Sequence, residues 1–170
     1  MHREEVVAIV PAHLLPNEAL RKPGEAAAPL NGWFRVALLG VAAGLLAVFG
    51  IAARLDPYDR DGTPLRMEAH RQLGFPRCTF YDLTGKPCPS CGLTTSFALL
   101  MHGDVVNSLR ANAVGTLLAL FCLAAIPWNL ACAVRGRLYI IRSLELSLTC
   151  FLAVFLALLL LRWGIVLALS

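Results

Sequence analysis

The sequence predicts an all-α integral membrane protein, a helical bundle with three transmembrane helices and a short half-helix. First, 58% of its 170 residues are hydrophobic and only 15% are charged, whereas soluble domains are roughly 45–50% apolar and about 25% charged. Second, three apolar segments are long enough to cross a bilayer as helices. Third, the basic residues behind the net charge of +4 lie beside those segments. This pattern indicates a lipid bilayer as partner and excludes a nucleic acid.

The first predicted span covers residues 33–53 (WFRVALLGVAAGLLAVFGIAA), about twenty residues and almost entirely apolar. Residues 1–32 contain four prolines and mixed charges without a sustained apolar face, so a flexible N-terminal tail is expected there. The remainder, residues 33–170, is predicted to form one membrane domain. After the first span, residues 65–73 (LRMEAHRQL) predict a short amphipathic helix near the interface.

A cysteine loop and half-helix are predicted over residues 78–112. The loop holds three of the six cysteines, Cys78, Cys88 and Cys91. Residues 93–101 (LTTSFALLM) are apolar but reach only about half the length of a bilayer-spanning helix, which favours a re-entrant or interfacial half-helix. Asp104 is expected to cap a further short helix that ends near Arg110.

The second and third spans are predicted at residues 113–134 and 144–161. Pro127 lies in the second half of the second span and predicts a kink. The short connection between these spans carries Arg135, Arg137 and Arg142 and no acidic residue, which is typical of a cytoplasmic loop. Three spans then place the N-terminus in the cytoplasm and the cysteine loop outside, in a multi-pass protein of the cell inner membrane.

Three interpretations of the cysteine loop remain open. In the first, the C-x-x-C pair Cys88 and Cys91 is redox-active, and a helix starting at Leu93 stabilises a thiolate. In the second, Cys78, Cys88 and Cys91 bind zinc as the cofactor. The fourth ligand would then come from His70, His102, Asp82 or Asp104. In the third, the cysteines form a structural disulfide or packed thiols that shape the loop.

The string CPSCGLTTSFALLMHGDVVNSLRAN, with Cys78 before it and a span after it, resembles the bacterial membrane proteins recorded as domain of unknown function 2752. The hallmark of that family is Cys-Pro-x-Cys-Gly-x-Thr-Arg, followed by Gly-Asp and Asn-Pro. In this chain the matching positions are Cys88, Pro89, Cys91, Gly92, Thr94, Gly103, Asp104 and Asn112. Thr95 stands where the hallmark has arginine, which removes a cation that would stabilise a thiolate, and Ala113 stands where it has proline.

The resemblance implies a small multi-span architecture and adds candidate supporting residues for the thiols: Thr94, Gly103, Asp104 and Asn112. The role expected from the sequence is structural or accessory, within an assembly with other membrane proteins. A thiol-disulfide redox protein and a zinc-binding membrane protein are the alternatives. Whether the chain is an enzyme stays open, because no phosphate-binding loop, Ser-His-Asp arrangement or paired carboxylates are recognisable.

Overall fold

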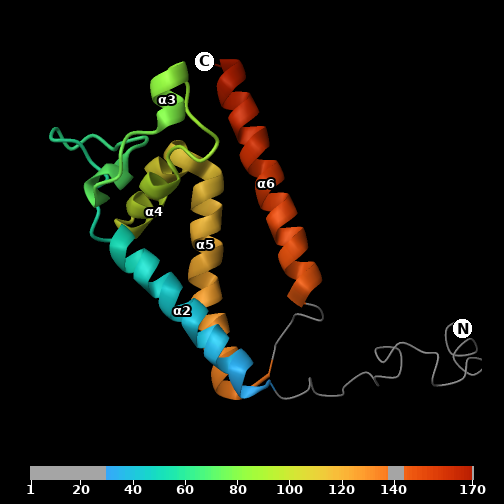
Figure 1. Cartoon of the computed structure of the whole chain (residues 1–170). Coiled ribbons are helices and arrows are strands. Elements are labelled where there is room, and N and C mark those ends of the chain that lie inside the picture. The colour runs from blue at the N-terminus through green and yellow to red at the C-terminus, as the bar shows by residue number, and fades with distance from the viewer. Residues whose placement is uncertain (1–29, 138–143, 170) are drawn as a thin grey trace, which may run out of the picture.

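The computed structural model describes residues 30–137 and 144–169, which form helices joined by loops (Figure 1). No strand occurs in this part of the chain, and an isolated bridge pairs Tyr58 with Pro64. The all-α prediction is therefore confirmed. The N-terminal tail expected up to residue 32 falls almost wholly outside the described residues. The elements are α2 (Gly32–Ala52), the 3-10 helix η2 (Ala69–Leu73), α3 (Thr79–Thr84), α4 (Leu93–Met101), α5 (Val105–Arg135) and α6 (Leu144–Leu169).

Three of the described helices are long and apolar enough to cross a membrane: α2, α5 and residues 146–168 of α6. They correspond to the three predicted spans. The last helix continues past the expected end at Leu161 because Arg162 and Trp163, which suggested a boundary, find polar partners elsewhere in the fold. Helix α4 is the predicted half-helix and has the bounds expected of it.

Helix α5 consists of two helical segments separated at Asn112, whose backbone is extended (φ −157°, ψ 102°). Asp104 caps the first segment by accepting a hydrogen bond from the Asn107 N–H at 3.1 Å, as expected. Asn112 caps the second segment in the same way, because its Oδ1 accepts from the Gly115 N–H at 3.0 Å. The second helical segment therefore begins after Asn112, next to residue 113, where the second span is predicted to begin.

Helix α4 packs against both parts of α5, and polar side chains join them. The Ser108 hydroxyl donates to the Ser96 carbonyl at 2.7 Å and lies 2.7 Å from the Thr116 hydroxyl. All three residues are buried, and every buried polar side-chain atom in the described chain has a hydrogen-bond partner. Satisfying these groups internally is what permits a half-helix inside an apolar bundle.

Apolar packing completes this end of the bundle. Phe49 of α2 and Phe97 of α4 stack with ring centroids 5.5 Å apart, beside the fully buried Ala119 of α5. Helices α2, α4 and α5 thus form one packed unit (Figure 1).

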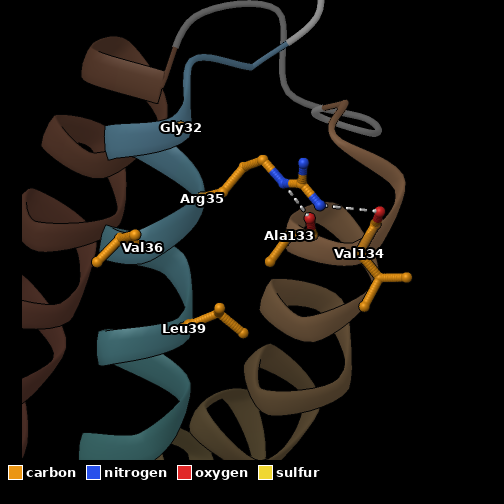
Figure 2. A pocket seen from close by; sticks show the side chains of 6 residues that line it. All are labelled: Gly32, Arg35, Val36, Leu39, Ala133 and Val134. Carbon is orange, nitrogen blue, oxygen red and sulfur yellow. Dashed lines mark hydrogen bonds between the residues drawn. The ribbon is translucent and has the colours of Figure 1, made fainter.

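At the opposite end of the α2–α5 pair, Arg35 joins the two helices beside a pocket (Figure 2). Its Nε donates to the Ala133 carbonyl at 2.7 Å, and its Nη2 donates to the Val134 carbonyl at 3.4 Å. These are carbonyls of the last turn of α5, where a cation is stabilised by the helix dipole. Arg35, at the edge of the first predicted span, is therefore a helix-capping residue.

The expected amphipathic helix at residues 65–73 is corrected by the structure. Only η2 forms in this segment. Its N-cap residue, Glu68, has a positive φ of 76°, and this backbone conformation interrupts a helix that would start at residue 65. Glu68 pairs there with Arg71 and with Arg77, at 3.2 and 3.0 Å. Helix α3, which follows Cys78, was not expected from the sequence.

Candidate functional site

The three loop cysteines lie close together, Cys78 just before α3 and the other two just before α4. Helix α3 lies near the C-terminal end of α6 (Figure 1). The sulfur atoms of Cys78, Cys88 and Cys91 all lie within 4.8 Å of one another. The closest pair is Cys88 and Cys91, whose sulfurs are 2.8 Å apart. We call this cluster the thiol site. It contains each of the three thiols that the sequence singled out.

The chain reaches this arrangement through two turns that need glycine. Cys78 is the N-cap of α3, and Gly85 ends that helix with a φ of 69°, which turns the chain so that Cys88 meets Cys78. Gly92 has a φ of 85° and is the N-cap of α4. Cys88 and Cys91 therefore occupy the turn that leads directly into the N-terminus of α4.

Asn112 ties the cysteine turn to α5. Its side-chain Nδ2 donates to the Cys91 carbonyl at 3.2 Å, while its Oδ1 caps the following helical segment. The side chain is fully buried, so both of its hydrogen-bonding groups are used where water does not reach. Asn112 is the one residue of the four expected supporting positions that contacts the cysteine turn in the described structure.

The other three supporting candidates lie away from the thiols. Thr94 faces an apolar pocket that it lines with residues of α2. Gly103 and Asp104 lie at the far end of α4, where Asp104 accepts from Asn107 and, at 3.4 Å, from the Tyr58 hydroxyl. Asp104 and Asn112 therefore lie near opposite ends of α4.

The two close thiols differ in acidity. Burial opposes ionisation of Cys88, but hydrogen bonds from Cys91, Ser90 and Cys78 outweigh it and hold the pKa of Cys88 below its usual value. Burial, followed by the hydrogen bond to Cys88, raises the pKa of Cys91 to about 12. Cys88 is therefore the thiol of the pair that ionises more readily, and Cys91 keeps its proton to higher pH.

This difference predicts a pH dependence of alkylation. Because the thiolate is the reactive form, Cys88 should react with iodoacetamide at a lower pH than an ordinary thiol. Cys91, with its pKa raised to about 12, should stay unreactive across the neutral range. Peptide mass spectrometry of the reduced protein after timed alkylation at a series of pH values checks this. Equal rates at both positions would contradict the assignment.

The last helix contributes side chains that the sequence did not assign to this site. The Arg162 Nη2 donates to the Ala111 carbonyl at 2.8 Å, and the Trp163 indole donates to the Pro87 carbonyl at 2.9 Å. Arg162 therefore brings a cation close to the cysteine turn, although Thr95 stands where the family hallmark has arginine. Thr95 is buried and accepts a hydrogen bond from the Ala69 N–H. In the sequence, Arg162 and Trp163 stand out as a polar pair within an apolar run, which was the available signal for their role.

The thiol site supplies three sulfur ligands to a metal ion. Among the described residues, no histidine or carboxylate joins this cluster. His70 and His102, two of the expected fourth ligands, instead lie within hydrogen-bonding distance of the Pro76 and Ala98 carbonyls. Thiolates on a tetrahedral zinc ion lie about 3.8 Å apart. Cys88 and Cys91, at 2.8 Å, would therefore have to separate to bind one.

Comparison with known proteins gives one family. Residues 78–126 match the model of the family described as protein of unknown function (DUF2752). The match covers the cysteine loop, α4 and most of α5. No curated protein and no solved structure matches the chain. The matched segment is the one that holds the thiol site.

Proposed function

Since residues 78–126 of this membrane protein match the model of the DUF2752 family, we propose that the matched segment is a thiol-disulfide exchange site. The observation that carries the proposal is the contact of Cys88 and Cys91 at 2.8 Å, with the Cys78 sulfur within 4.8 Å of both. A disulfide places its two sulfurs at about 2.0 Å. The pair can therefore close with a small side-chain movement and without a change of fold.

The exchange partner is a protein or small-molecule disulfide that reaches this end of the bundle. The Cys88 thiolate attacks one partner sulfur, the partner S–S bond breaks, and its second sulfur leaves as a thiolate. Cys91 then gives its proton to that thiolate and attacks the Cys88 sulfur. A Cys88–Cys91 disulfide forms and the first partner sulfur is released as a thiolate. The partner is reduced by two electrons and the cysteine pair is oxidised, and the reverse sequence oxidises a partner dithiol.

The test is trapping of the mixed disulfide on the full chain. Cys91→Ser should accumulate a mixed disulfide at Cys88 when the purified protein meets oxidised glutathione, because the second step is blocked. Cys88→Ser should form far less. Cys150→Ser is the matched control, since that exposed thiol of α6 lies outside the cluster. Equal trapping in the Cys91→Ser and Cys88→Ser proteins would refute the assignment.

The location of the site is part of the proposal. The C-terminal end of α5, at Arg135, and the cysteine loop lie at opposite ends of that helix (Figure 1). The positive-inside rule then supports a cytoplasmic N-terminus and a thiol site on the outer side of the inner membrane, where disulfides persist. An impermeant thiol reagent added to intact cells should label Cys88. If Cys88 is labelled only after the membrane is permeabilised, the thiol site lies on the cytoplasmic side and the proposed orientation is reversed.

Zinc binding is the second candidate, favoured by the clustering of three sulfurs. Cys78, Cys88 and Cys91 would hold the ion, with water or a partner group in the fourth position, and zinc would supply Lewis-acid character there. This candidate requires about one zinc per chain in protein purified under reducing conditions, lost in the Cys78→Ser variant. Elemental analysis separates it from the exchange site, which needs no metal.

The structural or accessory role expected from the sequence stays a prediction. It requires that Cys88→Ser and Cys91→Ser change neither glutathione exchange nor metal content and alter stability alone. An assembly with other membrane proteins would then be the context of the chain, and co-purification in mild detergent is the measurement that checks it.

A further inference from the structure

Two consecutive residues of α6 contact the surroundings of all three cysteines. The Trp163 ring meets Phe80 edge-on, with centroids 6.0 Å apart, and Phe80 lies in the first turn after Cys78. The Trp163 indole N–H donates to the carbonyl of Pro87, which precedes Cys88. Arg162 donates to the Ala111 carbonyl. That carbonyl oxygen lies against Gly92, the residue after Cys91, at 2.7 Å from the position of a Cβ there.

Helix α6 has little other support. None of the residues in its apolar window is buried, and the helix stands apart from α5 along much of its length in Figure 1. Another contact with α5 is the stacking of Phe151 on Phe121, with centroids 4.3 Å apart. Near its C-terminal end, α6 is therefore joined to the bundle through residues that flank the cysteines.

These hydrogen bonds provide partners both for the donors on α6 and for the backbone carbonyls near the cysteine turn. The break at Asn112 diverts the Gly115 N–H to the Asn112 side chain, so the Ala111 carbonyl loses its helical donor. A guanidinium and an indole N–H in an apolar helix also require acceptors. Arg162 supplies the donor that Ala111 lacks, at 2.8 Å. Removing either donor would leave a carbonyl next to the cysteine turn without its partner.

We propose that Arg162 and Trp163 are positioning residues, which hold the backbone around Cys78, Cys88 and Cys91 so that the sulfurs stay within bonding reach. The inference rests on the proposed exchange function. Through these two residues the docking of the last helix controls how readily the Cys88–Cys91 disulfide forms.

The experiment measures the equilibrium between the dithiol and the disulfide in the full-length protein. Wild type and the Arg162→Leu and Trp163→Phe variants are equilibrated in glutathione buffers and the Cys88–Cys91 disulfide is quantified by mass spectrometry. Each variant should lower the effective concentration of the thiol pair about tenfold, the effect of one lost hydrogen bond of this kind. Arg162→Lys, which keeps a charged donor, should restore most of it. Arg54→Gln and the exposed Trp33→Phe are matched controls that should equal wild type.

The outcomes are distinguishable. If wild type forms no disulfide in any glutathione buffer, the exchange function itself fails. If wild type does and the Arg162→Leu and Trp163→Phe proteins match it, the positioning role is overturned. Trp163→Phe keeps an aromatic ring against Phe80 and removes only the indole donor, so it remains informative if Arg162→Leu does not fold.

Discussion

Replacing Gly92 with alanine is expected to destabilise the protein by more than about 2 kcal/mol and to abolish the thiol site. Gly92 has a φ of 85°, which carries a penalty for any residue with a Cβ. An added Cβ would also lie 2.7 Å from the Ala111 carbonyl oxygen and 2.8 Å from that of Arg66. Both are backbone atoms, so neither moves aside without displacing α5 or the preceding loop.

Unfolding of the Gly92→Ala protein in detergent, followed by circular dichroism, measures the loss of stability, and glutathione trapping measures the loss of the site. Gly103→Ala is the matched control. Gly103 has a similar φ of 78°, but no atom lies within 4 Å of a Cβ built there. It should show the conformational penalty alone, about 1 kcal/mol. Equal losses in the two variants would mean that the close approach of Gly92 to Ala111 is not required.

Replacing Asn112 with alanine is the second change with a large expected effect, a loss of about 2–4 kcal/mol. The variant loses the cap on the second segment of α5, where Oδ1 accepts from Gly115. It also leaves the partly buried Cys91 carbonyl without its donor. Alanine further favours helix through the break, which would turn α4 and its cysteines away from the span.

Asn112→Ser separates the two roles of this residue. A serine hydroxyl is an effective N-cap but is too short to reach the Cys91 carbonyl. Stability should therefore recover by about 1 kcal/mol relative to alanine, while disulfide formation between Cys88 and Cys91 stays impaired. Denaturation and glutathione equilibration on the same preparations supply both readings. Normal disulfide formation in the alanine variant would show that the tether to Cys91 does not position the thiols.

The three long helices, the half-helix and their order could be predicted from the sequence alone. Hydropathy and length are local properties, so α2, the second segment of α5 and α4 lie within a residue or so of where they were expected. Capping is local as well, which is why Asp104 was placed correctly. The same local reasoning overextended the helix before Leu73, because nothing in the composition announces the positive φ at Glu68.

Which polar residues meet depends on how the helices pack. Gly103 and Asp104 belong to the same short motif as Cys91 and Gly92, yet α4 carries them to its far end, away from the thiols. Arg162 lies 51 positions from Ala111 in the chain and donates to its carbonyl. Such a pairing depends on how α6 docks and on the carbonyl that the break at Asn112 exposes. Neither is encoded in local periodicity, because partners distant in sequence are selected by packing and by the need to satisfy every buried polar group.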